Sequence, residues 1–238
     1  MNCADLPKKY KFAINQPLMK SMTKLLMQIP FLFMANVLYA QQPHEMQDYT
    51  LIKQSKWIIP HNDTLAYAFS TYQDEKALLL KRNILNAKSA SIAYPKNLNF
   101  KDGIIELDLA SPVGRAGYIG LAFRIKDEQH YEALYFRPGY SGTINAVQYM
   151  PEKKSEFNWW DYVDKKYQAK AVLPLKARFH VKAVVKGNQI TVFVNNQATP
   201  VFIYKPLDSS LRQGSVGFWL GNSAVGAYKN LKILNFNQ

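Results

Sequence analysis

Four polar side chains between residues 124 and 148 are of types that bind hydroxyl-rich ligands. They are Arg124, Tyr135, Arg137 and Gln148. An arginine offers several donors in one plane, and Tyr and Gln add directional hydrogen-bond partners. Convergent polar and aromatic groups are typical of a ligand-binding site. The alternative is that the arginines form internal salt bridges, and residue types alone do not decide between the two.

Two adjacent tryptophans, Trp159 and Trp160, follow in a segment from Pro151 to Pro174 that has no clear strand pattern. A flat indole ring can stack on the apolar face of a sugar ring. Long connections of this kind are usually functional or disordered, and the aromatic content argues against disorder. We predict a stacking platform for carbohydrate. The alternative is that both rings plug the edge of a sheet.

Glu106 and Asp108 form a pair of acids on one face of a predicted strand. Residues two apart on a strand are about 7 Å apart at the backbone. Their side chains can reach the carboxyl separations that either glycosidase mechanism uses. We therefore name them as candidate catalytic acids. The alternative is that they are solvated, or paired with a cation such as Arg124.

The stretch 100–137 predicts strands whose side chains alternate between two faces. In the first strand the apolar residues at 105, 107 and 109 oppose Glu106 and Asp108. In the second, Arg124 opposes the apolar residues at 119, 121, 123 and 125. In the third, Tyr135 and Arg137 oppose the side chains at 132, 134 and 136. We expect Arg124, Tyr135 and Arg137 to share one concavity while their apolar neighbours fill the interior.

The rest of the chain after residue 42 also reads as short strands separated by turn residues. No window there has a helical period over twelve residues. Many strands without helices between them predict an antiparallel sandwich or barrel. Residues 41–60 either wrap the domain or pair as an edge strand. The predicted strands are Thr64–Phe69, Ala77–Leu80, Ser89–Ala93, Ile104–Ala110, Gly117–Ile125, Tyr131–Phe136, Thr143–Tyr149, Phe179–Val185, Gln189–Val194, Pro200–Tyr204, Ser215–Leu220 and Ala227–Phe236.

Residues 19–40 are typical of a secretory signal peptide. Lys20 and Lys24 precede a short apolar run that ends at Ala40. The run is too short and too interrupted for a membrane span, and the alternative is a buried amphipathic helix. Residues 1–18 are polar and precede Met19. We expect that translation starts at Met19 and that residues 1–18 are a leader assigned in error. Residues 41–238 then form one exported domain, either periplasmic or extracellular.

The single cysteine, Cys3, lies in that leader. The predicted mature chain therefore has no disulfide, no thiol nucleophile and no cysteine for a metal or a lipid anchor. The four histidines are isolated in the sequence, and no phosphate loop, nucleophile elbow or dinucleotide pattern occurs. We predict no metal site and no cofactor from these residues.

The chain is basic, with a formal net charge of +13. Basic proteins can bind nucleic acid or other acidic polymers. The lysines are scattered rather than gathered in a dense stripe, which favours ordinary solvated charge. We therefore expect no nucleic acid partner, and an anionic glycan stays open.

At these residues the chain resembles the concanavalin A-like lectin/glucanase superfamily. Within it, the sequence is most similar to secreted bacterial domains of the 3-keto-disaccharide hydrolase or laminin-G-like type. The resemblance covers about residues 64–236. The matching segments are Phe100–Gly103, Ile105–Asp108, Gly120–Arg124, Tyr131–Pro138, Val147–Tyr149, His180–Lys182, Val192–Asn195, Gly214–Trp219 and Tyr228–Ile233.

The resemblance implies a jelly-roll sandwich of two curved antiparallel sheets with a carbohydrate site on the concave one. It also allows a structural calcium ion. Laminarinase-type members carry Glu-x-Asp-x-(x)-Glu on one strand. Here Glu106 and Asp108 are followed by Leu109-Ala110-Ser111, so the final acid is missing. That departure puts the retaining mechanism of those enzymes in doubt.

We therefore predict an exported, all-β, single-domain jelly roll that binds carbohydrate. Arg124, Tyr135, Arg137 and Gln148 supply the polar contacts, and Trp159 or Trp160 the stacking platform. One alternative is a glycoside hydrolase that acts on an oligosaccharide or a 3-keto-glycoside. The other is a structural or adhesion module. The sequence leaves the sugar and the oligomeric state open.

Overall fold

The computed structural model describes residues 45–49, 53–60, 65–82, 90–154, 159–221 and 225–236. The chain separates into two units, Met1–Gln41 and Gln42–Gln238, and every described residue belongs to the second. The predicted leader (1–18) and signal peptide (19–40) lie outside the described residues. Within the described ranges, no helix is long and apolar enough to cross a membrane.

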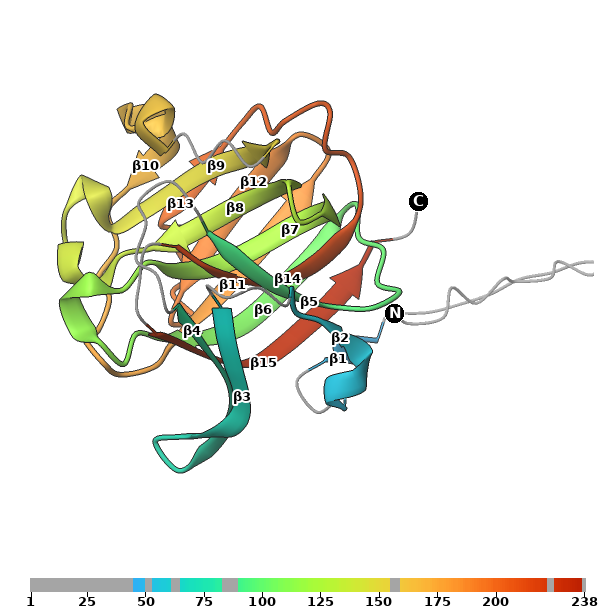
Figure 1. Ribbon diagram of the computed structural model, residues 1–238. Helices are drawn as coiled ribbons and strands as arrows, with labels where there is room; N and C mark the ends of the chain where they lie inside the picture. The colour runs from blue at the N-terminus through green and yellow to red at the C-terminus, as the bar shows by residue number, and fades with distance from the viewer. Residues whose placement is uncertain are drawn as a thin grey trace, which may run out of the picture. The chain divides into compact units, whose positions relative to one another are not determined.

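The described residues form two antiparallel sheets, which we call sheet I and sheet II (Figure 1). Sheet I has the order β13-β12-β11-β6-β15-β4-β3, and β1 pairs with β15 beside this path. Its strands are β1 (Gln47–Asp48), β3 (Leu65–Tyr72), β4 (Glu75–Arg82), β6 (Gly103–Ala110), β11 (Phe179–Lys186), β12 (Gln189–Val194), β13 (Phe202–Tyr204) and β15 (Val225–Asn235).

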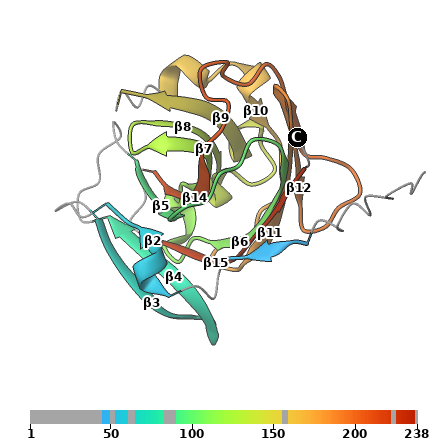
Figure 2. The ribbon, with the colours of Figure 1, turned by 90° about the vertical axis from the view of Figure 1, so that its right-hand side faces the viewer.

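Sheet II has the order β10-β9-β8-β7-β14-β5-β2. Figure 2 shows sheets I and II facing each other, with the β3–β4 hairpin projecting at one end. The described residues contain no α-helix, which confirms the predicted all-β jelly-roll sandwich. The strands of sheet II are β2 (Trp57–Ile58), β5 (Ser91–Pro95), β7 (Ile119–Asp127), β8 (His130–Phe136), β9 (Val147–Lys153), β10 (Gln168–Ala169) and β14 (Ser215–Leu220).

Most predicted strands are confirmed to within a few residues. Of the two expectations for residues 41–60, edge pairing is confirmed, since β1 pairs with β15 and β2 with β5. The predicted strand Thr143–Tyr149 is wrong in its first half. Gly142 has φ +79°, and the Thr143 hydroxyl accepts a hydrogen bond from the Asn145 amide at 3.2 Å. This turn starts a short 3₁₀ segment, η4 (Ile144–Ala146), so β9 begins only at Val147.

A hydrophobic core fills the space between the two sheets. On β6 the side chains of Ile105, Leu107 and Leu109 are fully buried, while those of Glu106 and Asp108 are only partly buried. The predicted alternation of β6 is therefore confirmed, and the two acids face outward from sheet I. Period-two alternation of this kind is what a strand needs to bury one face.

The alternation of β7 breaks at Arg124. This residue has φ +51°, and the registers with β8 and β14 both shift here, which marks a β-bulge. Phe123 packs in the core between the sheets, whereas Ile125 packs in a second cluster on the outer face of sheet II. The prediction that Ile125 shares the face of Phe123, opposite Arg124, is therefore wrong.

The outer face of sheet II carries a second apolar cluster, which we call the outer cluster. Both faces of sheet II are therefore covered with apolar side chains, although one of them lies outside the sandwich. Buried residues on a sheet's outer face are unusual for a surface that only meets water. The outer cluster consists of Ile92, Tyr94, Ala122, Ile125, Tyr131, Ala133, Tyr135, Met150 and Trp219.

Candidate functional site

The centre of the outer cluster is a stacked pair of rings, Tyr135 from β8 and Trp219 from β14. Their centroids are 4.8 Å apart and their planes differ by 19°. Gly120 of β7 lies between them in the sheet, because it pairs with both residues. A Cβ on Gly120 would come within 2.9 Å of the Tyr135 Cβ and 2.2 Å of the Leu134 carbonyl oxygen. The absent side chain thus leaves the space in which the rings meet.

Arg137 follows Tyr135 on the same face of sheet II. Its guanidinium carbon is 5.5 Å from the ring centroid of Tyr135 and 5.4 Å from that of Tyr140. Its Nη2 donates to Gln148 Oε1 at 2.8 Å. The Arg137 Nε is buried and has no hydrogen-bond partner among the described residues. Tyr140 is 42% exposed, so the guanidinium lies beneath a ring that solvent reaches.

Gln148 connects this arginine to the tryptophan segment. Its Nε2 donates to the carbonyl oxygens of Tyr162 at 2.9 Å and Trp159 at 3.3 Å. Gln148 is fully buried, so it holds the 3₁₀ segment η5 (Trp159–Tyr162) against β9 rather than facing solvent. Its amide therefore positions the platform that the sequence predicted.

The two tryptophans of η5 have different surroundings. Trp159 is partly buried and packs against the outer cluster, whereas Trp160 is 44% exposed. Their rings meet edge to face at 6.1 Å. Trp159 thus anchors the segment, and Trp160 is the ring that remains open to a ligand. The structure brings Tyr135, Arg137 and Gln148 together with both tryptophans.

Arg124 is not part of this group, and the prediction that it shares a concavity with Tyr135 and Arg137 is wrong. The β-bulge turns its side chain toward Glu132, on the inner side of sheet II. All five N–H groups of the guanidinium have acceptors, so none remains for a ligand. The acceptors are the carbonyl oxygens of Lys101, Gly187 and Leu211 and the carboxylates of Asp102 and Glu132.

Glu132 is the buried partner of Arg124, with Nη1 to Oε1 at 3.3 Å. Its other oxygen, Oε2, accepts from the Tyr149 hydroxyl at 2.6 Å and from the Asp208 amide at 3.3 Å. Burial raises the pKa of Glu132 to about 7, although Tyr149 and Arg124 oppose that rise. Arg124 therefore forms an internal salt bridge, which was the alternative to ligand binding for the arginines.

The candidate catalytic acids lie on the outer face of sheet I, on the other side of the sandwich from Trp160. Asp108 Oδ1 is 2.8 Å from His180 Nδ1, and Asp108 Oδ2 accepts from Asn230 at 2.6 Å. Burial raises the pKa of Asp108, but the hydrogen bonds from His180 and Asn230 outweigh it, so the pKa is lowered. A general acid needs the opposite shift.

Glu106 has Lys182 Nζ at 3.8 Å across the β6–β11 pair. Both acids therefore have cationic or hydrogen-bonding neighbours on sheet I, and neither pairs with Arg124, which belongs to sheet II. No exposed aromatic ring of the described residues lies beside them on β6 or β11. Their catalytic role stays a prediction.

A structural calcium ion would need a cluster of oxygen ligands. Among the described residues, no group of three or more His, Cys, Asp or Glu side chains is placed to hold a metal ion. Asp102, directly before β6, and Asp108 on β6 already accept hydrogen bonds from protein donors. A structural calcium ion therefore stays an expectation from the resemblance.

Sequence reasoning missed two residues of this face, Trp219 and Tyr140. Trp219 is fully buried under the stacked ring of Tyr135, and Tyr140 belongs to the short 3₁₀ segment η3 (Pro138–Tyr140). The alternation within β14 was a usable signal for Trp219, since Phe218 and Trp219 must face opposite sides. No sequence pattern indicates that Tyr140 lies over Arg137.

Of the comparisons with known proteins, only the structural one found similar proteins. No protein-family model matches the sequence, and no curated protein matches it. A carbohydrate-binding module of Bacillus subtilis, CBM66, matches the structure with a TM-score of 0.56 at 13% identity, over 76% of this chain and 96% of the other. A Bacillus subtilis protein of unknown function with a galectin-like fold gives 0.53 at 15% identity, over 79% and 94%.

A putative glycosyl hydrolase from Parabacteroides distasonis also matches, with a TM-score of 0.51 at 12% identity over 81% of this chain and 100% of the other. At such low identities these likenesses concern the fold. They show that the chain shares the two-sheet antiparallel sandwich of these structures, as the resemblance implied.

Replacing Gly120 by Ala should disturb the outer cluster. The added Cβ must push the Tyr135 strand away, and overpacking of this kind costs about 1–3 kcal/mol. We expect a lower free energy of unfolding in urea together with a changed near-ultraviolet circular dichroism spectrum. Gly142→Ala is the control: its Cβ meets no atom within 4 Å, so it adds backbone strain alone and leaves the aromatic spectrum unchanged. Equal spectra for Gly120→Ala and the wild type would contradict the stacking role.

Glu132 should make stability depend on pH. Its folded pKa of about 7 is above its ordinary value of 4.5, so the folded state binds more protons between these values. The contribution is therefore full below about pH 4.5 and is lost as the pH rises toward about 7. Urea unfolding measures the free energy of unfolding of the wild type and of Glu132→Gln across this range. The wild-type value minus the Glu132→Gln value should fall as the pH rises from about 4.5 to about 7. The exposed Glu128→Gln is the control and should run parallel to the wild type, and a parallel Glu132→Gln profile would refute the assignment.

Proposed function

We propose that this chain is an exported carbohydrate-binding domain whose ligand lies on the outer face of sheet II. The observation that carries the proposal is Trp160, an exposed indole held in place through Gln148 beside a buried, ring-flanked Arg137. A solvent-facing aromatic ring next to a guanidinium supplies stacking and directional donors, the two contacts that a sugar needs.

The polar contacts are fewer than the sequence alone predicted. Arg124 has no free donor, and Gln148 is used in holding η5, so Arg137 and Tyr140 are the polar contacts that the proposal keeps. Arg137 has an unpartnered Nε among the described residues, and Tyr140 presents both a ring and a hydroxyl. A carbohydrate-binding module is among the structurally similar proteins, which supports this class of ligand.

We also propose that the domain is exported, because of the predicted signal peptide, and that it has no nucleic acid partner. A glycoside hydrolase is the second candidate, because a matching structure is titled a putative glycosyl hydrolase. The lowered pKa of Asp108 and the position of both acids on the opposite sheet weigh against it. An adhesion module would bind a protein rather than a glycan through the same exposed rings.

Trp160→Ala should weaken binding of the best oligosaccharide from a glycan array at least tenfold, measured by titration calorimetry. The loss follows from removing the exposed stacking surface, since aromatic residues at the centre of a site contribute most of the affinity. Its control is Ile203→Ala, which removes an exposed apolar side chain, 55% accessible, from the outer face of sheet I. No binding by any glycan, or equal affinity for Trp160→Ala, would refute the proposal.

Glu106→Gln should leave glycan affinity unchanged within about twofold, because Glu106 lies on the opposite sheet from Trp160. Incubation of the wild type with the same oligosaccharides should release no new reducing ends. Release of product that Glu106→Gln abolishes would establish the hydrolase instead. Capture of a protein partner without any glycan binding would favour the adhesion module.

A further inference from the structure

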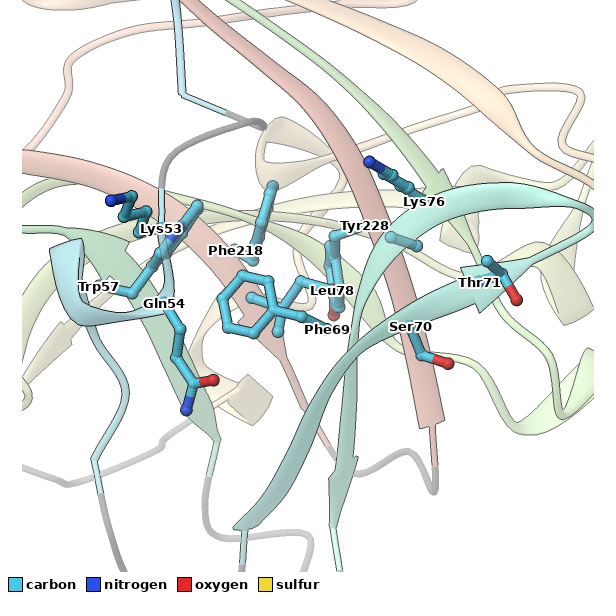
Figure 3. Close-up of a pocket in the computed structure, with 11 residues that line it drawn as sticks. Lys53, Gln54, Trp57, Phe69, Ser70, Thr71, Lys76, Leu78, Phe218 and Tyr228 are labelled. Atoms are coloured by element: carbon cyan, nitrogen blue, oxygen red, sulfur yellow. The ribbon is translucent and has the colours of Figure 1, made fainter.

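The core of the sandwich opens to solvent at one edge, where β3 ends sheet I and β2 ends sheet II. A cavity of about 480 Å³ lies there, between the β3–β4 hairpin and the 3₁₀ segment η1 (Gln54–Lys56) (Figure 3). Gln54 spans the opening by donating to the Tyr67 hydroxyl at 2.9 Å. This volume falls within the range of small-molecule sites, and the cavity is distinct from the face that carries Trp160.

The walls of this cavity are stacked aromatic rings of the core. Trp57 stacks on Phe218 at 5.2 Å, and Phe218 stacks on Tyr228 at 4.8 Å. Phe69 meets Trp57 edge to face at 6.5 Å and is 40% exposed, whereas the other three rings are buried. Figure 3 shows the Phe69 ring among these side chains. The slot between such rings suits a flat apolar ring rather than a hydroxyl-covered one.

One buried donor of the cavity lining has no hydrogen-bond partner in the part of the chain that the structure describes. Trp57 is 5% exposed, and its Nε1 makes no hydrogen bond among the described residues. The Tyr228 hydroxyl, in contrast, donates to the Trp219 carbonyl oxygen at 2.6 Å and is not available. Among the described residues this indole N–H is thus a donor without an acceptor, whereas buried N–H groups are normally paired.

The charges around the cavity have one sign. Lys53 and Lys76 line it, on its two sides in Figure 3, and no Asp or Glu does. Neither lysine has an ion pair among the described residues, whereas Lys229 nearby on β15 pairs with Glu75 at 2.7 Å. Two unpaired ammonium groups beside an apolar slot favour an anion.

We propose that this inter-sheet cavity binds an aromatic carboxylate. The planar ring lies in the cavity against Phe69 and the Trp57–Phe218 stack, and the carboxylate remains at the mouth near Lys53 and Lys76. The hydroxyl groups of Ser70 and Thr71, which also line the cavity, donate to the same carboxylate. This site is independent of the glycan site, because the two share no residue.

The test uses 2-naphthoate and its uncharged analogue 2-naphthylmethanol in titration calorimetry with the full chain. We expect 2-naphthoate to bind with a Kd of about 1 mM or tighter, and the alcohol at least tenfold more weakly. Phe69→Ala should weaken naphthoate binding at least tenfold. The double variant Lys53→Gln/Lys76→Gln should reduce naphthoate to the affinity of the alcohol.

The substituted residues are exposed, so circular dichroism should show that each variant keeps its fold. Lys81→Gln, also exposed on β4 but outside the cavity, is the control for charge and should bind as the wild type does. Ile203→Ala is the control for loss of an exposed apolar side chain. Glycan binding should persist in Phe69→Ala, so failure of this site and failure of the Trp160 site are separately visible.

No naphthoate binding at millimolar concentration would overturn the proposal, as would equal affinity for Phe69→Ala and the wild type. Equal affinity of the acid and the alcohol would overturn the assignment of an anion. Displacement of naphthoate by an oligosaccharide would show that the cavity takes sugars instead.

Discussion

The hydrophobic core between the two sheets is the constraint on which the rest of this structure depends. Each strand of the sandwich has one side that must face that core, because the side chains alternate with a period of two. On β6 this puts Ile105 and Leu107 inside and leaves Glu106 and Asp108 outside. Once the inner face is set, the position of each other side chain follows from its parity along the strand, unless the backbone itself departs from regular geometry.

One departure has the largest consequence. The β-bulge at Arg124 adds a residue to β7, so the parity of the strand reverses between Phe123 and Ile125. A strand that kept its register would have put the guanidinium on the outer face. Instead the side chain meets Glu132 on the inner side, where five acceptors surround it. A buried arginine with an acid at 3.3 Å is thereby a structural group, because removing the arginine would leave the buried Glu132 without its cation.

The outer face of sheet II shows how small and large residues divide the space on a sheet. Gly120 separates Tyr135 from Trp219, and its missing side chain is what lets the two rings stack. Tyr135 also gives Arg137, which directly follows β8, an aromatic neighbour, and Gln148 then joins that arginine to the segment with Trp160. The opposite edge of the sandwich uses aromatic rings differently, since there the rings line an opening into the core. One fold thus presents two aromatic surfaces of unlike polarity.

The sequence alone was sufficient for the all-β class, for most strands, and for the group formed by Tyr135, Arg137 and Gln148, because these depend on alternation and on turn residues, which are local. It was also sufficient for the idea that Trp159 and Trp160 lie beside this group, although not for which ring faces solvent. Three things were decided only in three dimensions: the bulge at Arg124, the placement of Tyr140 over Arg137, and the cavity between β2 and β3. Each depends on contacts between segments far apart in the chain, and such contacts leave no periodic signal. The two acids of β6 show the same limit. Their face was predictable, but their partners come from strands more than seventy residues away: His180 and Asn230 for Asp108, and Lys182 for Glu106.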